Sequence, residues 1–252
     1  MARPLFHRDN LGIILKKDSA KQSYLGILGN ISVTSLAPLS ECPRKFYLKN
    51  ICKLEEDNYA QPFDEESPAI SSSKRGSKVH FEISRSILQK DFSKNPDASI
   101  QFALDYLSNL RADYEILSEK LFKFPIFGYM TSGIPDALLV PLKEVPFLVI
   151  DFKTGGKKET SHLFQLYAYA FGVYQLGMLS KEKEIKLVVL YLDLKEILEV
   201  TSNFEKISQE VFKVWKNLYN LDQVNLNHCP QCSFYGLCYS SVATTSACAK
   251  IN

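Results

Sequence analysis

The stretch GIPDALLVPLKEVPFLVIDFK, residues 133–153, contains two apolar segments that each carry acidic residues near one end. The segments 133–142 and 146–153 have the length and composition of β-strands, and the second is almost fully apolar before its polar end. Asp136 lies in the first segment, and Asp151 follows in the second, fifteen residues later. If these two strands pair, both carboxylates meet at one end of the same sheet.

Such a pair of carboxylates predicts a site for a hard cation. Two carboxylates and one backbone carbonyl form the all-oxygen ligand set that Mg²⁺ or Mn²⁺ prefers. Asp151 and Lys153 are two residues apart, so they face the same side of a strand. Lys153 can then orient an attacking water or stabilise charge on a phosphate. The alternative is that these are ordinary turn residues, the usual explanation of an isolated D-x-K sequence.

Three further residues are candidates for the same site. His80, in GSKVH, offers an imidazole to an ion of the Mn²⁺ type, although a lone histidine is more often a plain helix residue. Gln165 and Tyr169 are four residues apart on a predicted helix and share a face. Gln165 could hold a water or a phosphate oxygen, and Tyr169 could stack on or hydrogen-bond to nucleic acid. Core packing is the alternative for this aromatic-rich helix.

The rest of the chain predicts a single α/β domain over residues 1–252, with a mixed β-sheet and helices on its faces. No internal repeat is visible, and the polar, acidic stretch 54–72 is predicted to be a loop insertion. The segment 115–130 is predicted to be a strand pair. Further helices are predicted at 74–90, 98–111, 161–177 and 203–220, and further strands at 184–193 and 195–201.

Composition and charge bound the class of protein. Apolar residues make up 46% of the 252, but no long uncharged apolar run exists, and the N-terminus lacks the apolar region of a secretion signal. We therefore expect a soluble cytoplasmic protein with no membrane partner. Residues 1–53 hold nine basic and three acidic side chains. This excess suits a polyanionic partner such as nucleic acid, although a solvated charged face is the commoner explanation.

Four of the six cysteines form a pattern. Cys229, Cys232 and Cys238 are spaced as C-x₂-C-x₅-C near the C-terminus, and Cys42 lies far upstream in CPRKFYL. A C-x₂-C pair is typical of metal or cluster ligation. Zinc bound by four cysteines and an iron–sulfur cluster are both compatible with four thiolates.

The motifs in their order resemble those of RecB-like nucleases in the PD-(D/E)xK superfamily. The order is G-x-x-x-H at 76–80, G-x-P-D at 133–136, D-x-K at 151–153 and Q-x-x-x-Y at 165–169. The resemblance implies a restriction-endonuclease-like nuclease core over 73–201. It also implies His80, Asp136, Asp151 and the Phe152 carbonyl as metal ligands, and a catalytic set of Lys153, Asp151, Asp136, Gln165 and Tyr169.

The cysteines extend this resemblance to the small CRISPR-associated RecB-like exonucleases of the Cas-four family. There, one upstream and three downstream cysteines hold an iron–sulfur cluster, usually 4Fe–4S. This implies that 31–52 and 225–240 form a module that joins the N- and C-terminal segments through Cys42, Cys229, Cys232 and Cys238.

The same resemblance implies a function. It is a Mg²⁺- or Mn²⁺-dependent exonuclease on single-stranded DNA, often with 5′→3′ polarity, that trims spacer precursors beside the CRISPR integrase complex. A homo-oligomer is compatible with it. The chain has no Walker A sequence, which favours a stand-alone nuclease. Two alternatives stay open: an exonuclease of general DNA repair, and a non-catalytic DNA-binding subunit that keeps the cluster.

Overall fold

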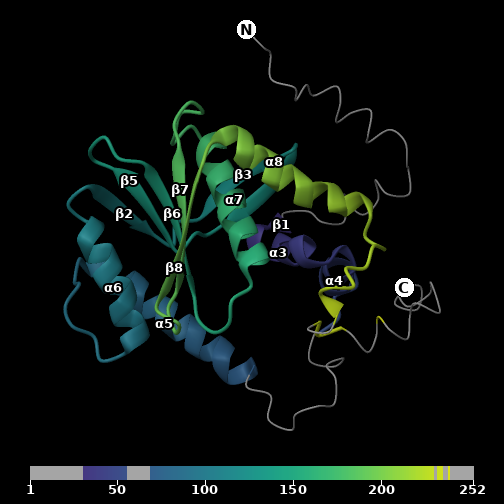
Figure 1. Cartoon of the computed structure of the whole chain (residues 1–252), viewed down its shortest axis with the longest axis horizontal. Helices are drawn as coiled ribbons and strands as arrows, with labels where there is room; N and C mark the ends of the chain where they lie inside the picture. Colours follow the sequence, from purple (N-terminus) through teal and green to yellow (C-terminus); the bar gives the residue numbers. More distant parts are fainter. Residues whose placement is uncertain (1–30, 56–68, 230–231, 235–237, 239–252) are drawn as a thin grey trace.

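The computed structural model describes residues 31–55, 69–229, 232–234 and 238 (Figure 1). Its elements in chain order are β1 (Ile31–Ser32), α3 (Val33–Glu41), α4 (Pro43–Phe46), the π-helix η1 (Tyr47–Ile51), α5 (Ala69–Gln89), α6 (Ala98–Leu110), β2 (Tyr114–Ser118), β3 (Phe122–Ile126), β4 (Tyr129–Gly133), β5 (Ala137–Pro141), β6 (Phe147–Lys153), α7 (Glu159–Gln175), β7 (Ile185–Tyr191), β8 (Glu196–Ser202), α8 (Phe204–Trp215) and the 3₁₀-helix η3 (Lys216–Tyr219). None of the helices in this described part is long and apolar enough to span a membrane.

The main sheet has five strands in the order β2-β5-β6-β7-β8. β6 and β7 are parallel, and the other neighbouring pairs are antiparallel. A parallel pair needs a crossover connection, and α7 supplies it between β6 and β7. The predicted mixed sheet flanked by helices is therefore confirmed.

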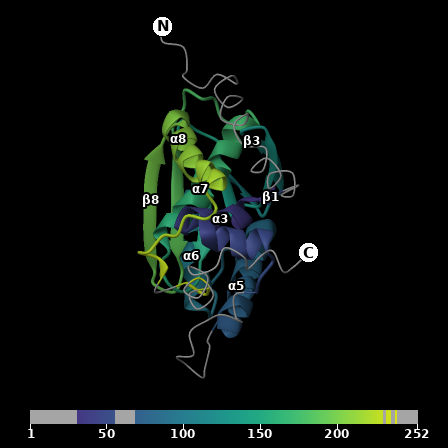
Figure 2. The same ribbon diagram turned by 90° about the vertical axis from the view of Figure 1, so that its right-hand side faces the viewer.

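Helices cover both faces of this sheet (Figures 1 and 2). The side chains of β6 belong to two hydrophobic cores, one on each face. Leu148, Ile150 and Phe152 belong to the core formed with α5 and α6. Phe147 and Val149 belong to the core formed with α3, α7 and α8. Because side chains alternate along a strand, Asp151 and Lys153 fall on the α7 side.

A second sheet, which the sequence patterns do not separate from the first, has the order β1-β4-β3. β4 ends at Gly133 and β5 begins at Ala137, so the predicted strand 133–142 is divided between two sheets. Pro135 offers no N–H to a strand partner and restricts the residue before it, which suits a crossing between sheets. Asp136 consequently comes just before β5 instead of inside a strand.

The end of the predicted loop insertion is helical, and the predicted cysteine module is only partly described. α5 begins at Ala69, so residues 69–72 are helical, while 56–68 lie outside the described residues. Cys42 separates α3 from α4 with an extended backbone, and Pro43 begins α4. In the C-terminal part of the module, residues 230–231, 235–237 and 239–240 lie outside the described residues.

Candidate active site

Strand register brings the two predicted carboxylates together. Ala137 pairs with Ile150 in the antiparallel ladder of β5 and β6, so Asp136 and Asp151 come at the same end of the sheet. The backbone N–H of Phe152 donates to Asp136 Oδ2 over 2.6 Å. The N–H and C=O of one strand residue point to the same edge, so the Phe152 carbonyl also faces the Asp136 side.

His80 approaches Asp136 from α5. Its Nδ1 lies 3.0 Å from Asp136 Oδ1. Burial lowers the pKa of His80, but the hydrogen bond and charge of Asp136 outweigh it and the pKa is raised. The helix approaches closely here because Gly76 has no side chain: a Cβ at that position would lie 2.9 Å from Thr154 Oγ1. Gly76 and His80, the two ends of the G-x-x-x-H motif, therefore lie against the end of β6 and the beginning of β5.

Lys153 lies between Asp151 and α7. Its Nζ is 2.7 Å from Asp151 Oδ2 and donates to Gln165 Oε1 over 2.8 Å. Burial raises the pKa of Asp151 to about 6, with Lys153 opposing the rise and Asp136 adding to it. Burial also lowers the pKa of Lys153, but Asp151 outweighs it and the pKa is raised. The lysine is therefore charged and held beside a carboxylate that is costly to ionise.

The Tyr169 side chain is buried in the hydrophobic core. Its side chain is 5% exposed, and a Cβ on Gly133 would lie 2.6 Å from its Cε1. Burial, followed by the charges of Asp151 and Asp136, raises the pKa of Tyr169. The ring therefore lies beside the two carboxylates, and the glycine of G-x-P-D makes room for it. The contact of Tyr169 with nucleic acid stays a prediction.

This arrangement fits a hard divalent cation. Asp151 Oδ2 is buried, and the partner that it has within the described chain is the Lys153 ammonium group, 2.7 Å away. A second carboxylate, Asp136, and the Phe152 backbone lie at the same strand end, which gives the oxygen-rich ligand set of Mg²⁺ or Mn²⁺. His80 can ligate through its other ring nitrogen or orient Asp136 through Nδ1. Within the described ranges, no three His, Cys, Asp or Glu side chains already converge as a metal site.

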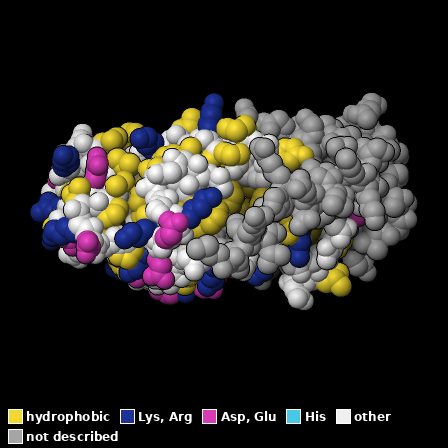
Figure 3. Space-filling model, turned by 90° about the horizontal axis from the view of Figure 1, so that it is seen from above, with side chains coloured by type: hydrophobic (Ala, Val, Ile, Leu, Met, Phe, Trp, Pro, Cys, Tyr) yellow, Lys and Arg dark blue, Asp and Glu magenta, His cyan; other side chains and the backbone are white. Residues whose placement is uncertain are grey.

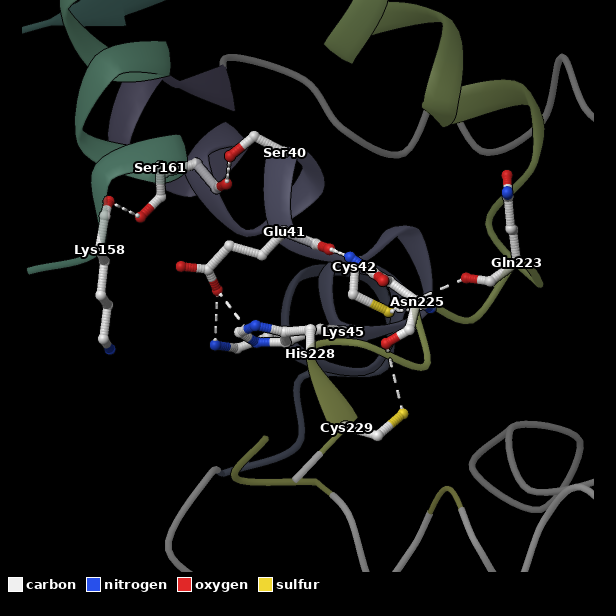
Figure 4. A network of polar contacts seen from close by, with 11 residues as sticks. Ser40, Glu41, Cys42, Lys45, Lys158, Ser161, Gln223, Asn225, His228 and Cys229 are labelled. Carbon is white, nitrogen blue, oxygen red and sulfur yellow. Dashed lines mark hydrogen bonds and ion pairs between the residues drawn. The ribbon is translucent and has the colours of Figure 1, made fainter. Parts of the chain in front are cut away.

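Two of the predicted cluster cysteines, Cys42 and Cys229, lie beside Asn225 in the segment 223–229 (Figure 4). We call this segment, together with the four cysteines, the cysteine clasp. Cys42, Cys229, Cys232 and Cys238 are free thiols. The N–H of Asn225 donates to Cys42 Sγ over 3.5 Å, and Cys229 Sγ donates to the Asn225 carbonyl over 3.4 Å. The segment therefore connects two cysteines that are 187 positions apart in the sequence.

The thiols also influence one another electrostatically. Burial raises the pKa of Cys229, Cys232 and Cys238, and neighbouring cysteines of the clasp raise each of them further. Within the described ranges, however, no three of these thiols converge as a ready-made metal site. The metal or cluster itself stays a prediction.

A buried polar group beside the clasp escaped the sequence patterns. The Glu41 carboxylate points toward Lys45 and His228 (Figure 4), with 2.9 Å from Oε2 to Lys45 Nζ and 3.3 Å to His228 Nε2. Burial raises the pKa of Glu41, but Lys45 outweighs it and the pKa is lowered. Only the spacing of Glu41 and Lys45, four residues apart, could have indicated part of this group.

A second polar group fixes the loop that follows Lys153. Asp193, just after β7, accepts from Arg75 Nη1 over 2.8 Å, from Ser99 Oγ over 2.8 Å and from the Gly155 N–H over 2.9 Å. It thereby ties α5, α6 and the β6–α7 loop together. No motif marks Asp193, since its role depends on residues from three other segments.

Comparison with known protein families finds one match. A family model described as PD-(D/E)XK nuclease superfamily matches residues 85–239, which is more than half of the chain and includes Asp136, Asp151 and Lys153. No curated protein sequence matches the chain.

Solved structures with a similar outline include two of low sequence identity. One is a protein named SSO0001, with 18% identity and a TM-score of 0.42, covering 90% of this chain and 91% of that one. Another is a presumed exonuclease from Eubacterium rectale, with 12% identity and a TM-score of 0.43, covering 86% of this chain and 91% of that one. The assignment rests on the family model and on the site it spans: this chain belongs to the PD-(D/E)XK nuclease superfamily.

Proposed function

We propose that this chain is a Mg²⁺- or Mn²⁺-dependent exonuclease that degrades single-stranded DNA from the 5′ end. The observation that supports it most is the meeting of Asp136, Asp151 and Lys153 at one sheet end, with Gln165 bonded to the lysine. Membership of the nuclease superfamily supports cleavage of phosphodiester bonds. The choice of DNA, of single strands and of the 5′ end follows the resemblance of the motif order.

Each residue of the site has a separate role in this proposal. A bound divalent cation supplies Lewis-acid activation of the phosphate and of water. Asp136, Asp151 and the Phe152 carbonyl hold it, and His80 either joins them or orients Asp136. Lys153 stabilises the negative charge that builds up on the phosphate. Gln165 fixes the Lys153 ammonium group, and Tyr169 supports the strand end from α7.

The clasp carries a structural cofactor in the same proposal. Cys42, Cys229, Cys232 and Cys238 hold a 4Fe–4S cluster that joins the N- and C-terminal parts of the chain, and zinc is the competing occupant. Iron, zinc and acid-labile sulfide are measured on protein purified without oxygen. About four irons per chain support the cluster, whereas a colourless protein with one zinc contradicts it.

The pathway that we propose is the trimming of spacer precursors beside the CRISPR integrase complex. Only the resemblance to the Cas-four family supports this step. Co-purification with a CRISPR integrase, and shortening of a spacer precursor that is then integrated, test it. Equal activity on any single-stranded end, with no effect of the integrase, favours an exonuclease of general repair.

Cleavage itself is tested with 5′- and 3′-labelled single-stranded DNA in the presence of Mg²⁺ or Mn²⁺. We expect Asp151→Ala and Lys153→Ala to abolish degradation while thermal unfolding stays cooperative. Asp113 and Lys143 provide the matched control, because they form an exposed acid–lysine pair at the opposite end of β2 and β5. Asp113→Ala and Lys143→Ala should cleave like the parent. Parent protein that binds DNA and never cleaves it is a non-catalytic subunit.

A further inference from the structure

The solvent-facing side of α5 carries an unusual mixture of residues. Lys74, Lys78 and Phe81 follow one another at intervals of four and three, so they share one face of the helix. The opposite face is buried through Val79, Ile83 and Ile87. Phe81 is nevertheless 60% exposed, so a large aromatic ring stands on the hydrophilic side of an amphipathic helix. Single exposed apolar residues are common, and the position of this one makes it informative.

Phe81 is the neighbour in sequence of a residue of the candidate active site. It follows His80 directly in α5, and His80 is bonded to Asp136. Two residues before Asp136, in the link between β4 and β5, Ile134 is also exposed, at 51%. The His80–Asp136 contact therefore holds α5 against the link between β4 and β5. Each of these segments exposes a large apolar side chain close in sequence to a candidate ligand. The side chains of His80 and Lys153 keep 26% and 20% of their surface exposed, so the site is open to solvent.

The basic side chains of α5 differ in whether they form an ion pair. Arg75 is bonded to Asp193, and Arg85 is paired with Glu82. Lys74 and Lys78 are exposed, and neither makes an ion pair or hydrogen bond with any residue in the described ranges. On the face opposite α5, by contrast, basic and acidic side chains are interspersed over the described residues (Figure 3).

We propose that Phe81, Ile134, Lys74 and Lys78 form the path by which a single DNA strand reaches the catalytic centre. Bases stack on the Phe81 ring and pack against Ile134, and Lys78 and Lys74 contact the phosphates. An aromatic ring flanked by cations is the combination that single-strand binding uses. Paired bases inside a duplex cannot stack on a protein ring, so the path would also explain a preference for single strands. This inference rests on the proposed function, since it gives that substrate a route.

Binding is measured in the Asp151→Ala background, where the strand is not consumed. The probe is a fluorescein-labelled oligothymidine, followed by anisotropy, with a duplex of the same length as comparison. Phe81→Ala should weaken single-strand binding roughly tenfold, because one stacked base contributes that order of affinity. Phe81→Trp should restore it, and duplex binding should not change. Each of Lys74→Ala and Lys78→Ala should reduce the slope of log K against log salt by about 0.7.

Leu88 is the matched control, because it is an apolar residue on the same side of α5, 72% exposed and seven residues further along the helix. Leu88→Ala should bind like the parent. A second readout uses 2-aminopurine at the strand end, whose fluorescence is quenched by stacking and should recover in Phe81→Ala.

Failure of the DNA path and failure of the proposed substrate give different results. If the Asp151→Ala parent binds the single strand and Phe81→Ala binds it equally well, the path is wrong and the proposed substrate stands. If the protein with Asp151 intact does not cleave single-stranded DNA and the Asp151→Ala protein does not bind it, the proposed substrate is wrong, and the path is wrong with it.

Discussion

The catalytic end of the sheet and the cysteine clasp are assembled by different means. At the catalytic end, register between β5 and β6 places Asp136 beside Asp151, and the Phe152 N–H donates directly to the first carboxylate. In the clasp, Cys42 and Cys229 meet through irregular backbone around Asn225. The hydrogen bonds of a sheet hold the paired residues in position by themselves. A contact between distant loops is instead stabilised most by a bound group that crosslinks the two segments.

The two regions meet at the first two turns of α7. Ser161, whose hydroxyl donates to the Lys158 carbonyl, lies beside Glu41 on the side of the clasp. One turn further along, Gln165 accepts from Lys153, on the side of the catalytic centre. Between them, His162 is buried beside the Tyr191 hydroxyl, and burial lowers its pKa to about 4. The first two turns of α7 thus carry residues beside the clasp and residues of the catalytic centre.

We expect Asp136→Asn to have the largest effect on the catalytic end without affecting the clasp. The change keeps the size of the side chain but removes one of the two charges that would hold the cation. We expect cleavage of single-stranded DNA to fall by at least about 100-fold, the scale of losing one transition-state contact, while iron content stays at the level of the parent. Rates and metal analysis on the same preparation check this. Cleavage at the parental rate would remove Asp136 from the site.

The converse change is Cys42→Ser in the clasp. We expect loss of bound iron or zinc and a fall of about 2–4 kcal/mol in the free energy of unfolding, the range for a lost long-range crosslink. Denaturant unfolding with metal analysis measures both. Ser40→Ala is the control, because that hydroxyl only donates to the Ala37 carbonyl within α3. Unchanged metal content in Cys42→Ser would show that Cys42 is not a ligand and would contradict the four-cysteine site.

Close packing at the catalytic end predicts a smaller effect. In Gly133→Ala, the new Cβ would lie 2.6 Å from Tyr169 Cε1 and 3.1 Å from Val33 Cγ2. Relief of this overlap should cost about 1–3 kcal/mol of stability. Gly156→Ala meets nothing within 4 Å and serves as the control. Thermal unfolding compares the two, and Tyr169→Leu should restore part of the loss in Gly133→Ala. Equal stability of both variants would contradict the close contact.

The sequence predicts the catalytic end better than the clasp for a physical reason. Strand alternation and pairing are local rules, so Asp136, Asp151 and Lys153 could be placed together from spacing alone. The division of 133–142 between two sheets was missed, because Pro135 and the crossing depend on β1 and β3. Glu41 with His228 was missed too, since nothing local relates two residues so far apart in the chain.

The smallest effect concerns Asp193, which supports the loop after Lys153 and takes no part in the ligand set. Burial raises its pKa, but Arg75 and the Gly155 N–H outweigh burial, so the pKa in the folded protein lies below the ordinary value. Its contribution is therefore complete above the unfolded pKa and is lost as the pH falls through the folded one. Since Arg75 is about half exposed, the contribution should be at most about 1 kcal/mol. Asp193→Asn should unfold more easily at neutral pH and show a shallower loss of stability toward acid, as followed by urea unfolding across this range. The same slope in parent and variant would mean that the Arg75–Asp193 contact is fully screened by solvent.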